Sequence, residues 1–111
     1  MTAPASRTAV AGASAEDALA ERVAAAVTAH PAVARLHGGI YNDVATYLPG
    51  RKLVGVRIGE RGAPVEVAVV LRCDRPIPET VAALRSEVSR LCGGARVDIT
   101  VADVVLPGEA S

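Results

Sequence analysis

Val65-Glu66-Val67-Ala68-Val69-Val70-Leu71-Arg72-Cys73 is the most strand-like stretch of this chain, and it decides the fold class. Its apolar side chains recur at every second residue up to Leu71, which predicts a strand with one face in a hydrophobic core. The preceding stretch Lys52–Ile58 alternates in the same way, and the glycines in Gly59–Ala63 suit a turn between the two. These stretches therefore predict an antiparallel hairpin.

The register of this hairpin follows from matching its side chains. Placing Gly59 opposite Pro64 matches apolar side chains with apolar ones and a cation with an anion. The predicted pairs are Val56 with Val67, Val54 with Val69, and Arg57 with Glu66. In this register, Val54, Val56 and Ile58 share the core-facing side of the hairpin.

Two segments have the 3.6-residue periodicity of amphipathic helices. The first opens at Ser14, a residue type that caps helix N-termini, and ends before Pro31. The second begins after Pro76, with Pro78 in its first turn, and ends at the glycines 93–94. Its apolar stripe consists of Val81, Leu84, Val88 and Leu91.

The remaining segments complete a sheet. Val44–Leu48 and Arg96–Val104 have strand-like patterns, whereas Val33–Leu36 is either a short strand or an extended link. Since a helix separates Val65–Cys73 from the last strand, a right-handed crossover should make these two strands parallel. The expected fold class is α+β: a small mixed β-sheet, formed by a β-meander followed by a β-α-β crossover, with two helices packed on one face.

Composition indicates one domain. The chain has 111 residues, 50% of them hydrophobic, with 12 basic and 12 acidic side chains. We expect residues 1–13 to be a disordered leader, residues 14–106 a single α+β domain and residues 107–111 a tail. No stretch approaches the roughly 18 apolar residues of a membrane span, and the N-terminus lacks a signal-peptide pattern. A cytoplasmic protein without direct membrane insertion is expected.

The residues give no sign of catalysis. His30 and His37 lack the spacing of a metal pair, and neither Cys73 nor Cys92 has a second cysteine nearby, as a zinc site requires. No serine lies in a nucleophile-elbow pattern. We therefore expect no enzyme, no cofactor and no bound metal, and two free thiols.

A nucleic-acid-binding module is the alternative function. The hairpin is locally basic, with Arg51, Lys52, Arg57 and Arg61, and residues 59–62 spell Gly-x-x-Gly. Interleaved carboxylates, a net charge of zero and the joining of two strands rather than two helices weigh against nucleic acid as a partner. A salt-dependent affinity for nucleic acid would favour this alternative.

The candidate interaction surface is the outward side of the hairpin. An apolar strip with a charged rim is typical of protein interaction surfaces. The strip consists of Leu53, Gly55, Ala68 and Val70, and its charged rim consists of Arg57, Glu66 and Arg72. Two interpretations stay open: the strip is exposed and binds a partner, or another segment covers it and it is ordinary core.

The succession of segments between Leu36 and Val105 resembles the alkaline shock protein family, the envelope stress response proteins of Gram-positive bacteria. The resemblance covers about residues 16–105 and points to a subgroup from high-GC bacteria. It is carried by Val33-Ala34-Arg35-Leu36-His37-Gly38-Gly39, Leu53-Val54-Gly55-Val56-Arg57-Ile58-Gly59, Val65-Glu66-Val67-Ala68-Val69-Val70-Leu71, Ile77-Pro78-Glu79-Thr80-Val81 and Val97-Asp98-Ile99-Thr100-Val101-Ala102-Asp103-Val104. The stretch 45–50 departs from the commoner family pattern, which is longer and more helical there.

The resemblance implies a non-catalytic interaction or scaffold protein. Proteins similar to this one associate with themselves in the cytoplasm, and some are held at the inner membrane surface by a small membrane-anchored partner. The expected partners are therefore further copies of the chain, in a homo-oligomer, and a membrane-anchored protein of this kind.

Overall fold

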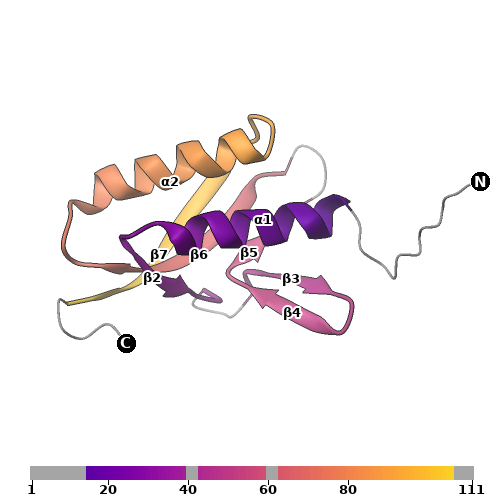
Figure 1. The fold of residues 1–111 in the computed structure, drawn as a ribbon, viewed down its shortest axis with the longest axis horizontal. Helices are drawn as coiled ribbons and strands as arrows, with labels where there is room; N and C mark the ends of the chain where they lie inside the picture. Colours follow the sequence, from indigo (N-terminus) through magenta and orange to yellow (C-terminus); the bar gives the residue numbers. More distant parts are fainter. Residues whose placement is uncertain (1–14, 40–42, 60–62, 107–111) are drawn as a thin grey trace, which may run out of the picture.

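The computed structural model describes residues 15–39, 43–59 and 63–106, so the expected leader (1–13) and tail (107–111) lie outside the described residues. Two helices and six strands make up this part of the chain, and Figure 1 shows their arrangement. In chain order they are α1 (Ala15–Ala29), β2 (Val33–Leu36), β3 (Ala45–Leu48), β4 (Arg51–Val54), β5 (Val56–Arg57), β6 (Val65–Arg72), α2 (Ile77–Leu91) and β7 (Val97–Val105). The α+β fold class is confirmed.

The central strand β6 has two faces, and the two helices cover only one of them. Its odd-numbered residues, such as Val67 and Val69, are buried in the core with Val23 and Val27 of α1 and Leu84 of α2. Both helices lie on this one side of the sheet, as expected (Figure 1). The alternation of β6 therefore directs one set of side chains into the core and the other set away from the helices.

Three other strands pair with β6. The last strand, β7, runs parallel to it along its whole length, which confirms the predicted parallel pairing. Since β7 occupies one edge of β6, β2 and β5 share the other: β2 pairs antiparallel with Val69–Leu71, and β5 with Glu66 and Val67. The segment Val33–Leu36 is thus a strand and not an extended link.

The hairpin register is confirmed at two of its three predicted pairs. Val56 lies opposite Val67 and Arg57 opposite Glu66, but the pairing of Val54 with Val69 is wrong. Val54 belongs to β4, which forms a separate two-stranded sheet with β3. The expected single meander is therefore broken between β4 and β5.

The break occurs at Gly55, where the chain changes sheets. Gly55 has φ of 99°, and a Cβ added there would lie 2.6 Å from the Cβ of Leu36. Its carbonyl accepts the N–H of Ala68 at 2.9 Å, and the carbonyl of Ala68 accepts the N–H of His37 at 2.9 Å. Through these two hydrogen bonds, Ala68 of β6 holds the end of β2 next to the start of β5. Only glycine fits both the positive φ and this close approach.

Gly55→Ala should destabilise the protein by about 1–3 kcal/mol more than Gly50→Ala, because only the first introduces a steric overlap. Gly50 is the matched control: its φ is 77°, yet nothing lies within 4 Å of an added Cβ. Urea denaturation of both variants measures the difference. Equal losses of unfolding free energy would contradict the close packing of β5 against β2.

Val67→Asp, like Val56→Asp, should unfold the domain. Val67 is only 1% exposed, and an unpaired buried carboxylate costs several kcal/mol against a total stability of about 5–15 kcal/mol. Arg57→Ala should cost only about 0.2–1 kcal/mol, because it removes one partner of a partly exposed ion pair. Thermal melts compare the stability of the three variants. If Arg57→Ala lowers the melting temperature most, the assignment of the core-facing and outward-facing sides is wrong.

Candidate interaction surface

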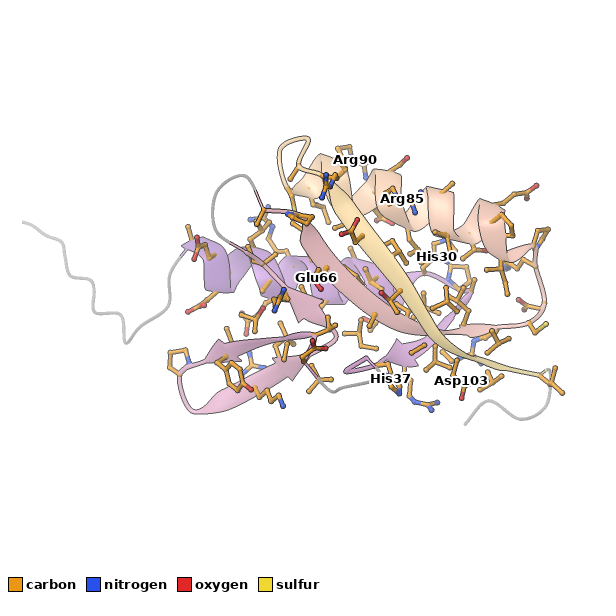
Figure 2. The ribbon with its side chains drawn as sticks, turned by 180° about the vertical axis from the view of Figure 1, so that it is seen from behind. His30, His37, Glu66, Arg85, Arg90 and Asp103 are labelled. Carbon is orange, nitrogen blue, oxygen red and sulfur yellow. The ribbon has the colours of Figure 1, made fainter. Side chains whose placement is uncertain are left out.

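The face of the sheet turned away from the helices is the candidate site, and it is called the open face below. Residues that are register partners share a face, so the strand pairings define its members. Figure 2 views the molecule from this side and labels Glu66 and Asp103. The open face consists of Arg35 on β2, Arg57 on β5, Glu66, Ala68, Val70 and Arg72 on β6, and Asp98, Thr100, Asp103 and Val105 on β7.

The register places these side chains in rows across the sheet. In one row Glu66 lies between Arg57 on β5 and Asp98 on β7. Four residues further along β6, Val70 lies between Arg35 on β2 and Asp103 on β7. In both rows the arginine is on the β2/β5 side and the aspartate is on the β7 side. In these two rows the open face therefore carries positive charge on the β2/β5 side and negative charge on the β7 side.

Two β-bulges bring Arg35 and Asp103 to this face. The pairing with β6 skips Ala34 of β2 between Leu71 and Val70, and it skips Ala102 of β7 between Val69 and Val70. Simple alternation from Val33 and from Val101 would have turned Arg35 and Asp103 towards the helices. Each bulge adds one residue and thereby reverses the direction of the side chains that follow.

The centre of the open face is not an exposed apolar strip. Ala68 and Val70 are both 0% exposed, so neither offers apolar surface to a partner. Both residues lie on the central strand, which has neighbouring strands on both sides. The apolar strip predicted at these positions is therefore wrong as an exposed surface.

Leu53 and the charged rim of the predicted strip lie on two different surfaces. Leu53 lies on β4, is half-buried and packs against the core cluster on the helix side. Arg57 is exposed and Arg72 half-buried, and both belong to the open face. The sequence thus identified five members of the open face, namely Arg57, Glu66, Ala68, Val70 and Arg72. It missed Arg35 and gave Asp98, Thr100 and Asp103 no role in a site.

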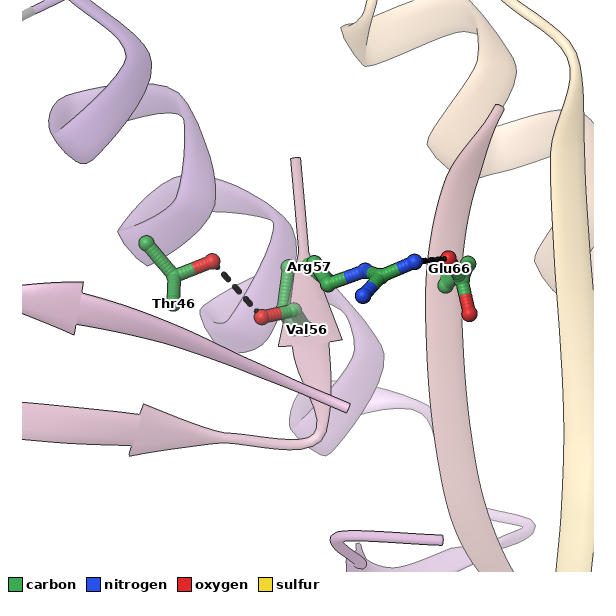
Figure 3. Close-up of polar contacts among 4 residues, drawn as sticks. All are labelled: Thr46, Val56, Arg57 and Glu66. Atoms are coloured by element: carbon green, nitrogen blue, oxygen red, sulfur yellow. Dashed lines mark hydrogen bonds and ion pairs between the residues drawn. The ribbon is translucent and has the colours of Figure 1, made fainter. Parts of the chain in front are cut away.

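The charged groups on the two sides differ in how they are engaged. Arg57 forms an ion pair with Glu66 of the neighbouring strand (Figure 3). Within residues 15–39, 43–59 and 63–106, three ion pairs form, and none of them includes Arg35, Asp98 or Asp103. One oxygen of Asp103, Oδ1, accepts the N–H of Val104 at 2.8 Å. Arg35 is an exposed cation at one edge of the sheet, and Asp98 is an exposed anion at the opposite edge.

The basic side chains of the hairpin are largely engaged within the chain. Arg51 forms an ion pair with Glu21 of α1, and the Lys52 ammonium lies 5.5 Å from the centre of the Tyr47 ring. Together with the Arg57 pair, these contacts leave no continuous row of free cations on the described part of the hairpin. Arg61 and the Gly-x-x-Gly stretch extend into residues 60–62, outside the described residues.

The β3–β4 hairpin carries the one strongly exposed aromatic ring of the described residues. Tyr47 is 75% exposed, and Val54 on the same side of the hairpin is 37% exposed. The opposite side packs inward, where Leu48 is buried and the hydroxyl of Thr46 donates to the carbonyl of Val56 at 2.7 Å (Figure 3). The hairpin is thus fixed to β5, with a small apolar area facing outward.

Both histidines have structural contacts. The Nδ1 atom of His30 accepts the N–H of Ala32 at 3.1 Å, and Nδ1 of His37 accepts the N–H of Gly39 at 2.9 Å. The described ranges contain no group of three His, Cys, Asp or Glu side chains that could hold a metal ion. Among the same residues, no helix is long and apolar enough to cross a membrane.

The two cysteines are not bonded to each other and differ in environment. Cys73 is exposed, whereas Cys92 is half-buried at the C-terminal end of α2. Burial raises the pKa of the Cys92 thiol, and the nearby Arg22 only partly opposes this shift. At a given pH, a higher pKa leaves a smaller fraction of reactive thiolate.

Titration of the unfolded, unreduced protein should find two thiols per chain, and in the native protein Cys73 should react faster with a disulfide reagent than Cys92. Exposure and the raised pKa of Cys92 both act in this direction. The variants Cys73→Ser and Cys92→Ser assign the two rates. A faster Cys92, fewer than two thiols or stoichiometric zinc would contradict this description.

The chain was also compared with models of known protein families, with curated proteins and with solved structures. None of the three comparisons found a match. A proposal for its function therefore starts from the residues and the geometry described above.

Proposed function

We propose that this protein is a non-catalytic interaction protein that associates with further copies of itself and docks on a small membrane-anchored partner at the inner face of the membrane. The observation that carries the first part is the open face, with cations along one side and carboxylates along the other. Separated charges of this kind favour a partner whose own charges are arranged in the opposite order.

The chemistry of the side chains supports a role without catalysis. Two hydroxyl groups donate to carbonyl oxygens of the backbone: Thr80 to Pro76 at 3.1 Å and Ser89 to Ala95 at 2.8 Å. A general base needs a free ring nitrogen beside a nucleophile. The Nδ1 atoms of both histidines already accept backbone N–H groups.

The resemblance to the alkaline shock protein family supports the finer part of the proposal. Proteins of that family self-associate in the cytoplasm, and some are recruited to the membrane by an anchored partner. The same expectation applies here, with a role in the response to envelope stress. The nucleic-acid alternative receives no support from the hairpin, because its described cations contact Glu21, Tyr47 and Glu66.

Sedimentation velocity of the full chain should show an average mass that rises with protein concentration up to about 1 mM. At a fixed protein concentration, this mass should fall when the salt concentration is raised. The reason is that exposed ion pairs weaken when salt shortens the Debye length, from about 14 Å at 50 mM to about 4 Å at 500 mM. A chain that stays monomeric at all concentrations would overturn self-association. Tight, salt-sensitive binding of a short RNA or DNA duplex in parallel titrations would instead favour the nucleic-acid alternative.

A further inference from the structure

The two charged sides of the open face lie at matching levels along β6. Arg57 and Asp98 flank Glu66, and Arg35 and Asp103 flank Val70. Each arginine therefore has an aspartate at its own level, two strands away on the far side of β6. Adjacent strands are about 4.8 Å apart, which places the backbone positions of the two charged residues of a row about 10 Å from each other.

We infer that a second copy of this chain docks on the open face, related to the first by a two-fold axis that lies between the two sheets and runs close to the direction of β6, about 15° from it. This inference rests on the proposed function and specifies which surface performs it. In this arrangement Arg35 meets Asp103 of the second copy, and Arg57 meets Asp98 of the second copy. Each contact occurs twice.

The symmetry explains why a second copy fits this face. A rotation by 180° about such an axis keeps each residue close to its level along β6 and exchanges the two sides of the sheet. The arginine side of one copy therefore faces the aspartate side of the other, level by level. A two-fold interface requires self-complementarity of this kind, and two-fold dimers are the commonest oligomers.

The centre of the face permits the close approach. Ala68 and Val70, at the middle of β6, have no exposed surface, so the residues that flank them make the contact. Sheets packed face to face lie about 10 Å apart, with strands crossing at about 30°. This crossing moves identical residues at the strand ends, such as the two copies of Arg72, away from each other. Glu66 remains paired with Arg57 of its own chain.

The size of the face sets the strength of the association. Three strands of about eight residues cover about 14 Å by 26 Å, roughly 350 Å² per copy, which is below the roughly 800 Å² per partner of stable complexes. The dimer is therefore weak and reversible. Its charge pairs contribute orientation and specificity more than affinity.

The row of Val70 offers the sharper test, because neither Arg35 nor Asp103 forms an ion pair within the described part of its own chain. Arg35→Asp places two carboxylates opposite each other in the dimer, and Asp103→Arg places two guanidinium groups there. Each variant should raise the dissociation constant of its own homodimer by about tenfold or more. Both residues are exposed, so circular dichroism melts should stay close to those of the parent chain.

Mixing the two variants supplies the decisive measurement. The carboxylate introduced by Arg35→Asp then meets the guanidinium introduced by Asp103→Arg, and the unchanged Asp103 of the first variant meets the unchanged Arg35 of the second. An equimolar mixture should therefore form heterodimers with near-parental affinity. Opposite charges face each other at both contacts of the row, as they do in the parent dimer.

Two single variants serve as controls. Arg85→Glu is the matched one, because Arg85 is an exposed arginine on α2, away from the open face. It changes the net charge in the same way as Arg35→Asp and should leave the dimer intact. Arg35→Gln, which removes charge without adding repulsion, should have an intermediate effect.

The possible results separate this inference from the proposed function. Loss of the homodimer in both variants with recovery in the mixture supports docking through the open face. If both variants self-associate like the parent chain, or if the mixture fails to recover, the open face is not the docking surface, although self-association stands. A parent chain that is monomeric at every concentration overturns both.

Discussion

One edge of β6 is shared by two strands, and the backbone at Gly55 makes this sharing possible. β2 and β5 meet end to end beside Ala68, whose N–H and carbonyl bond to Gly55 and His37. The Leu36 side chain fills the space that a Cβ at position 55 would need. Because the chain turns out of the sheet at this point, β3 and β4 form their own hairpin. The same turn sets Arg35 and Arg57 on the same side of β6, which creates the positive side of the open face.

The two faces of β6 have different physical roles. Towards the helices, a core built from Val, Leu and Ala supplies the stability, and it contains no Phe or Trp. On the open face, the central residues are equally buried, but the flanking strands contribute charges instead of apolar surface. Folding therefore depends on burial on one face. Recognition depends on the arrangement of charge on the other, which salt can modulate.

Sequence patterns could predict the elements of this fold but not every position on its faces. The matched pairs of Val56 with Val67 and Arg57 with Glu66 fixed half of the hairpin, because apolar and charged complementarity agree on one register. The alternation of residues 52–58 hid the break at Gly55, since a positive φ leaves no mark in hydropathy. Arg35 and Asp103 were missed as members of one face because each follows a bulge that changes the parity of its strand. A charged residue at a core-facing position of an otherwise regular strand is the signal that could have indicated each bulge.

The central claim is that the open face is the surface through which two copies meet. Amide chemical shifts of the ¹⁵N-labelled chain, followed over a dilution series from about 1 mM downward, test it most directly. The account predicts concentration-dependent shifts that cluster at Arg35, Arg57, Asp98 and Asp103, with little change along the outer surfaces of α1 and α2. Shifts confined to the β3–β4 hairpin around Tyr47, to the helices, or absent altogether would contradict it.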